Sequence, residues 1–236
     1  MKIINKKKDA IQELKRISSR TISDANNKTN AVVQEILLEV KNYGDIAVEK
    51  YTRKFDGFDP IPMQVREEEL KDAWNEIDNN LKHSLEIAHE RIQKFHKKEI
   101  PQSFTINGEY GDVVQRRWKP VKNAGIYIPG GRAAYPSTVL MNAIPAKVAG
   151  VEEIVMVSPG NNEGKINKTV LAAAHLSGVN KVFRIGGAQA IGALAFGTSQ
   201  INKVDVISGP GNIYVTTAKK LIYGSTGIDS LVQVKY

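Results

Sequence analysis

The sequence predicts an α/β fold, in which a helical N-terminal region is followed by a parallel β-sheet. Only four of the 19 glycines lie before residue 120, and fifteen follow it. In the glycine-rich part, four apolar strand-like runs each end in a glycine or proline turn and lead into a helix-like run. The runs start near Ile126, Ile154, Val182 and Val204, 28, 28 and 22 residues apart, which is typical of βα units in a parallel sheet.

Amphipathic helical patterns dominate the first 119 residues. Residues 30–44 predict a helix that ends at Gly44, where a C-terminal cap belongs. Its apolar residues share one helical face: Val32, Val33, Ile36, Leu37 and Val40. Residues 79–99 predict a second long helix, and residues 103–118 predict a β-hairpin that turns at Asn107 and Gly108.

The composition narrows the possible function classes. The chain has no cysteine, which excludes disulfides, thiolate catalysis and zinc–thiolate sites and favours a reducing cytoplasm. The first ten residues, "MKIINKKKDA", lack the apolar core of a signal peptide, so we expect no secretion signal. The longest apolar runs are shorter than a membrane span, and we expect no contact with a membrane.

The net charge of +8 is concentrated in the second half of the chain. Residues 121–236 contain 11 Lys and Arg residues but only 5 Asp and Glu residues. This balance suits an anionic ligand such as a dinucleotide, and it also suits solvated surface lysines that aid solubility. A basic nucleic-acid-binding protein is a further alternative, but no basic stripe interleaved with aromatic residues is present.

Ligands of open parallel sheets bind beyond the carboxyl ends of the strands, which here are glycine-rich turns. Three polar side chains stand at these turns: Tyr127 in the first strand, Gln189 after the third and Asn212 after the fourth. Each has a purely structural alternative, since Tyr127 could be a core aromatic, Gln189 could close a turn and Asn212 could cap a helix. Neither a G-x-G-x-x-G motif nor a P-loop is present.

The four histidines predict neither a catalytic site nor a metal site. His83, His89 and His96 fall in one predicted helix without acidic residues or cysteines at ligand spacing, and we interpret them as surface residues. His175 follows three alanines in another predicted helix and is interpreted as a surface or core residue. No nucleophile–base pair stands out either.

Four segments of the chain, residues 40–57, 124–160, 182–198 and 204–220, together resemble the histidinol dehydrogenase family, in the family's order. The resemblance implies incomplete-Rossmann-like α/β domains of the aldehyde-dehydrogenase-like type, cytoplasmic homodimers, and NAD and zinc as cofactors. It also implies oxidation of L-histidinol through L-histidinal to L-histidine, in histidine biosynthesis. The family's NAD-contacting Tyr, Gln and Asn match Tyr127, Gln189 and Asn212.

The resemblance further implies how the chain is divided. We expect residues 1–119 to be the helical region with its hairpin, residues 120–231 to be the NAD-binding domain, and residues 232–236 to be a tail outside the family pattern. The family's zinc ligands and its acid–base Glu-His pair have no counterparts up to residue 231. We therefore expect a chain that is incomplete at its C-terminus and inactive alone, and a non-catalytic NAD-binding module remains the alternative.

The family pattern continues with Ala-Gly-Pro-Ser-Glu-Val-Leu after the equivalent of Leu231. One permitted coding of residues 232–236, read in the neighbouring frame, restores Gly-Pro-Ser-Glu-Val. We therefore interpret the last five residues as the product of a frameshift after Leu231, or of a sequencing error that mimics one, which the nucleotide sequence of the gene would test.

Overall fold

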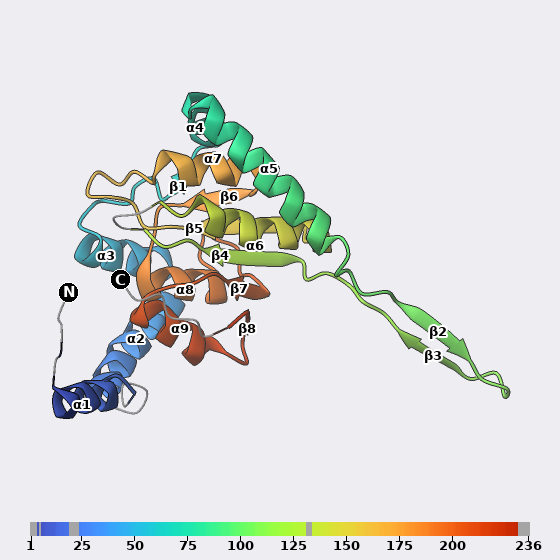
Figure 1. Ribbon diagram of the computed structural model, residues 1–236, viewed down its shortest axis with the longest axis horizontal. Coiled ribbons are helices and arrows are strands. Elements are labelled where there is room, and N and C mark those ends of the chain that lie inside the picture. Colours follow the sequence, from blue (N-terminus) through green and yellow to red (C-terminus); the bar gives the residue numbers. More distant parts are fainter. Residues whose placement is uncertain (1–3, 5, 19–23, 131–133, 231–236) are drawn as a thin grey trace.

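The computed structural model describes residues 4, 6–18, 24–130 and 134–230. The predicted α/β fold is confirmed in these residues (Figure 1). The helices are α1 Lys7–Ser18, α2 Asp24–Tyr43, α3 Asp45–Phe55, α4 Glu67–Glu76, α5 Asn79–His96, α6 Pro136–Ala149, α7 Lys168–Leu176, α8 Gly187–Phe196 and α9 Ile213–Ile222. The strands are β1 Gln64–Val65, β2 Phe104–Asn107, β3 Val113–Arg116, β4 Asn123–Tyr127, β5 Glu153–Val157, β6 Lys181–Phe183, β7 Val206–Ser208 and β8 Gly227–Ile228.

The main sheet has the strand order β1-β6-β5-β4-β7-β8. Strands β4 to β8 run parallel, and β1 pairs antiparallel with β6 at one edge. The four predicted βα units are confirmed as β4–α6, β5–α7, β6–α8 and β7–α9. The two edge strands were not predicted, because two residues are too few to show a periodic pattern. The predicted tail at 232–236 lies outside the described residues.

The sheet is covered on both faces. Helices α4 to α7 pack on one face, and α2, α3, α8 and α9 pack on the other (Figure 1). Strand β5 shows the consequence: Ile154 and Met156 belong to the core on the side of α4 to α7, while Val155 and Val157 belong to the core on the side of α2, α3, α8 and α9. Because successive side chains point to opposite faces, a strand buried on both sides reads as a continuous apolar run.

Helix α2 packs against α8, which in turn lies on the sheet. Its residues Val33, Ile36, Leu37 and Val40 are buried as predicted, and α2 ends before Gly44, whose φ is +54°. Val32 was predicted on the same face, but it is 41% exposed. The two helices approach closely at Gly192, where an added Cβ would lie 3.2 Å from side-chain carbons of α2.

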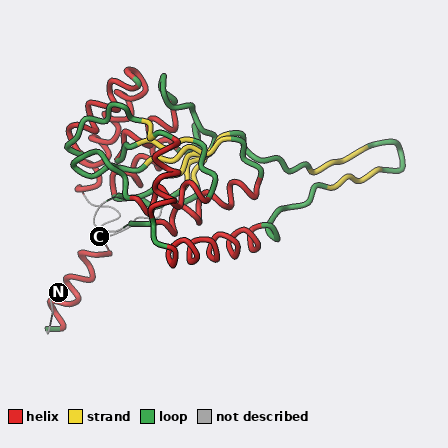
Figure 2. The backbone as a smooth tube through the Cα atoms, turned by 90° about the horizontal axis from the view of Figure 1, so that it is seen from above, coloured by secondary structure: helices red, strands yellow, loops and turns green. Residues whose placement is uncertain are grey.

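The predicted hairpin forms, and it projects away from the body of the molecule (Figures 1 and 2). Its turn differs from the prediction. Asn107 pairs with Val113, so residues 108–112 make the connection, instead of a turn centred on Asn107 and Gly108. The backbone hydrogen bond from Gly108 to the Asp112 carbonyl and the positive φ of Gly111 favour this longer loop.

The predicted boundary at residue 120 remains a prediction. The region before it contributes strand β1 to the main sheet and helices to both of its faces. The second long helix, α5, ends at His96, three residues before its predicted end. Of its apolar residues, Leu85 is buried and Phe95 is 63% exposed.

Candidate functional site

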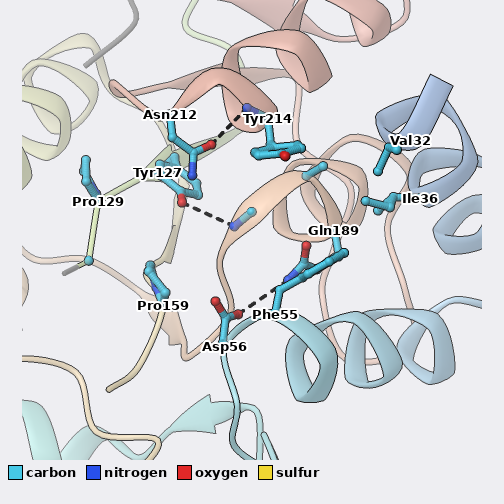
Figure 3. A pocket seen from close by; sticks show the side chains of 13 residues that line it. Val32, Ile36, Phe55, Asp56, Tyr127, Pro129, Pro159, Gln189, Asn212 and Tyr214 are labelled. Carbon is cyan, nitrogen blue, oxygen red and sulfur yellow. Dashed lines mark hydrogen bonds between the residues drawn. The ribbon is translucent and has the colours of Figure 1, made fainter. Parts of the chain in front are cut away.

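A pocket of about 340 Å³ lies at the carboxyl ends of the parallel strands (Figure 3). Parts of the chain that are far apart in sequence meet there: helices α2 and α3, strand β4, and the turns that precede α8 and α9. Its lining residues are Val32, Ile36, Phe55, Asp56, Tyr127, Pro129, Gly130, Pro159, Gly187, Ala188, Gln189, Asn212 and Tyr214. All three side chains predicted from the strand ends therefore line one pocket.

Tyr127 is both a core residue and a wall of the pocket. It is 3% exposed, and its Oη accepts a hydrogen bond from the backbone N–H of Gly187 at 3.3 Å. Because this N–H opens helix α8, the phenol ties the end of β4 to the start of that helix. The core interpretation and the site interpretation are thus compatible.

Gln189 lies in the first turn of α8 and is 1% exposed. Its Nε2 donates to Oδ2 of Asp56 at 3.5 Å, at the long limit of a hydrogen bond. Its Oε1 is buried without a hydrogen-bond partner. A buried acceptor of this kind is unfavourable unless a bound group supplies a donor.

Asn212 caps helix α9. Its Oδ1 accepts hydrogen bonds from the backbone N–H groups of Tyr214 at 3.0 Å and Val215 at 3.1 Å. The capping interpretation is therefore correct, but it uses only the oxygen of the amide. The Nδ2 group keeps two N–H donors that the cap does not use.

Asp56, like Phe55 and Tyr214, lines the pocket without having been predicted from the sequence. It follows the last residue of α3 and is half-buried, and burial raises the pKa of its carboxyl from 3.8 to about 6. In Figure 3, Asp56 and Gln189 lie on one side of the pocket and Tyr127 and Asn212 on the other. The only signal in the sequence was that Asp56 falls within one of the segments that carry the family resemblance.

The backbone of the pocket is shaped by close approaches at glycine. A Cβ on Gly130 would lie 2.5 Å from Cγ of Pro159, and Gly187 has a φ of +63°. Helices α8 and α9, each 10 residues long, both begin at the pocket with their N-termini. These termini present backbone N–H groups and a partial positive charge to a ligand.

The histidines lie away from the pocket lining. His83 and His175 are exposed, while His89 and His96 are half-buried on α5. Nδ1 of His96 pairs with the Glu99 carboxylate at 2.5 Å. Within the described part of the chain, no three His, Cys, Asp or Glu residues are grouped so that they could hold a metal ion.

The fold and the pocket define an α/β protein with a pocket at the carboxyl edge of a parallel sheet, where proteins of this class bind their ligands. The family model described as histidinol dehydrogenase matches residues 19–233. The chain therefore belongs to the histidinol dehydrogenase family. None of the helices in the described residues is long and apolar enough to cross a membrane.

Comparison with individual proteins gives the same family. The chain is 84% identical over 231 residues to histidinol dehydrogenase of Prochlorococcus marinus strain MIT 9312, which covers 98% of this chain and 52% of that protein. It is 49% identical to the enzyme of Synechococcus sp. strain ATCC 27144. The crystal structure of histidinol dehydrogenase from Elizabethkingia anophelis matches with a TM-score of 0.81 at 37% identity, over 87% of this chain and 47% of that chain. The chain spans about half the length of the curated relatives that it matches.

Proposed function

We propose that this chain binds NAD in the pocket described above and forms the NAD-binding half of a histidinol dehydrogenase. The observation that supports this proposal is the convergence of Tyr127, Gln189 and Asn212, from three different βα units, on one pocket. These are the positions that match the family's NAD-contacting residues.

The residues of the pocket fit a dinucleotide. The N-termini of α8 and α9 suit its pyrophosphate, because the helix dipole places a partial positive charge at each of them. The buried Oε1 of Gln189 calls for a hydrogen-bond donor, and the Nδ2 group of Asn212 offers donors in return. NAD carries both kinds of group. Its amide N–H and its ribose hydroxyls are donors, and its carbonyl and phosphate oxygens are acceptors. When bound, NAD supplies the hydride acceptor.

The protein residues would then orient the cofactor. The exposed rings of Phe55 and Tyr214 line the pocket and offer flat surfaces against which a planar ring can pack. The hydrogen bond between Gly187 and Tyr127 holds the end of β4 against the start of α8. A cofactor held at two polar points and one flat surface has one orientation, which is what hydride transfer requires.

For the whole reaction, we propose the family's chemistry: oxidation of L-histidinol through L-histidinal to L-histidine by a cytoplasmic, zinc-dependent homodimer. The described residues do not fit zinc, because they contain no group of three ligands. We therefore propose that this chain binds NAD but does not oxidise L-histidinol by itself.

Calorimetric titration of the purified chain with NAD tests the first part of the proposal. We expect saturable binding that Gln189→Ala weakens about tenfold, since one hydrogen bond to the ligand is lost. An absence of binding would overturn the proposed function. Absorbance at the NADH wavelength, measured with L-histidinol, NAD and Zn²⁺, tests the second part. NADH formation by this chain alone would refute the claim that it does not turn over.

A further inference from the structure

The amide of Gln189 has one orientation that the pocket favours. Its two ends lie in different surroundings, because Nε2 faces the carboxylate of Asp56 and Oε1 is buried without a partner. An ionised carboxylate accepts hydrogen bonds but cannot donate them. The ionised form of Asp56 therefore holds the N–H end of the amide toward itself and leaves the C=O end for a ligand.

The neighbouring charged and titratable groups do not compete with Asp56 for the Gln189 amide. On its own helix, the guanidinium of Arg53 is engaged by Glu49 and Asp59 and forms no ion pair with Asp56. The other titratable groups that line the pocket are Tyr127 from β4 and Tyr214 from α9. Burial alone raises the pKa of Asp56, to about 6, so its charge changes within a mildly acidic range.

We propose that Asp56 is a positioning residue, which orients the Gln189 amide so that Oε1 accepts a hydrogen bond from an N–H or O–H group of the bound dinucleotide. This inference rests on the proposed NAD site. When Asp56 takes up one proton from solvent, its carboxyl becomes able to donate to Oε1. The amide can then turn and present N–H groups to the ligand's donor, where no acceptor remains. Ligand affinity consequently falls at acidic pH.

NMR spectroscopy tests the link between the two side chains without any ligand. In the ¹⁵N-labelled full chain, the Gln189 side-chain amide signal is assigned by its loss in Gln189→Glu. We expect its chemical shift to titrate with a midpoint near pH 6 in the unsubstituted chain and to stay constant in Asp56→Asn. Asp59→Asn is the matched control and should leave the titration unchanged, because Asp59 pairs with Arg53. A flat titration, or one that persists in Asp56→Asn, would overturn the inference.

NAD titrations at pH 5 and pH 8 test the consequence for binding. The unsubstituted chain should bind about tenfold more weakly at pH 5, whereas Asp56→Asn should bind with one affinity at both values, because the asparagine side chain does not titrate. Asp56→Ala should weaken binding about tenfold at pH 8. In the Gln189→Ala background the same change should have no further effect, because the amide that Asp56 orients is gone.

The possible outcomes separate the two proposals. Additive losses in the double variant mean that Asp56 acts only through the structure around it, which contradicts the positioning role. NAD binding with no titration of the Gln189 signal refutes the inference and leaves the proposed function intact. Titration of the signal without NAD binding refutes the proposed function, and with it the ligand part of the inference.

Discussion

Lys219 and Asp229 form an ion pair that anchors the turn between β7 and α9. The Lys219 side chain is 3% exposed, and its Nζ donates to the Asp229 carboxylate and, at 3.1 Å, to the carbonyl of Gly209. The other carboxylate oxygen of Asp229 accepts from the backbone N–H of Gly209 at 2.9 Å. The turn that leads to Asn212 is therefore held at both polar backbone groups of Gly209, its N–H and its C=O.

Replacement of this lysine should loosen the turn. We expect Lys219→Met to lower the free energy of unfolding by about 2–3 kcal/mol, because it leaves the Asp229 carboxylate unpaired beside the core. The expected loss is smaller than for a fully buried ion pair, since the Asp229 side chain is 36% exposed. Lys220→Met is the matched control, on the exposed side of the same helix, and should change stability little. Equal effects of both variants in urea unfolding would contradict the anchoring role.

Gly209 itself cannot be replaced without a clash. Its φ is +107°, and an added Cβ would lie 2.1 Å from the carbonyl oxygen of Tyr127. We expect Gly209→Ala to destabilise the chain by about 3 kcal/mol or more, through backbone displacement at the pocket. Gly57→Ala is a control with a positive φ of +76° but nothing within 4 Å, and should cost about 1 kcal/mol. Thermal unfolding of the two variants compares the clash with φ strain alone.

The two functions of Asn212 can be separated by substitution. Asn212→Ala removes the cap of α9 and should reduce stability by about 1 kcal/mol. Asn212→Asp keeps an oxygen for the cap, so its thermal unfolding should match that of the unsubstituted chain. Because neither alanine nor aspartate has a side-chain N–H donor, NAD affinity should fall in both variants. If Asn212→Asp binds NAD as well as the unsubstituted chain does, Asn212 is only a cap.

Asp56 should make the folded state less stable as pH rises. Its pKa is higher in the folded state than in the unfolded chain, so the folded state binds the proton more tightly between pH 4 and 6. The cost of the buried charge is absent below about pH 4 and fully present above about pH 6. Asp56→Asn should therefore match the unsubstituted chain at pH 4 and be more stable by about 1–2 kcal/mol at pH 8, after allowance for partial exposure.

This prediction is checked by the difference between the two unfolding curves at each pH. The difference removes the opposite contribution of Glu39, Glu69, Glu153 and Glu163, whose pKa values are lowered in the folded state. A variant that is less stable than the unsubstituted chain at pH 8 would show that the Asp56 carboxylate is stabilising.

Local patterns were sufficient for the four βα units. Strands β4 and β5 are buried on both faces and helices α7 and α8 are apolar, so such units could be predicted from runs of neighbouring residues. The same reasoning placed Tyr127, Gln189 and Asn212 at one edge of the sheet. Val32 was placed on the same helical face as the buried residues of α2, but it is exposed and lines the pocket, because helical spacing cannot show where a helix face opens onto a pocket.

The sequence by itself determined the α/β class, the order of the βα units, the polar residues at their turns and the family. The tertiary structure decided the rest. Edge strands β1 and β8 form only because longer strands offer them unpaired backbone groups. Asp56 reaches Gln189 across 133 positions of sequence, and its pKa changes only because other segments exclude water there. Contacts between distant segments leave no periodic trace in a sequence, so they become visible only when the chain is folded.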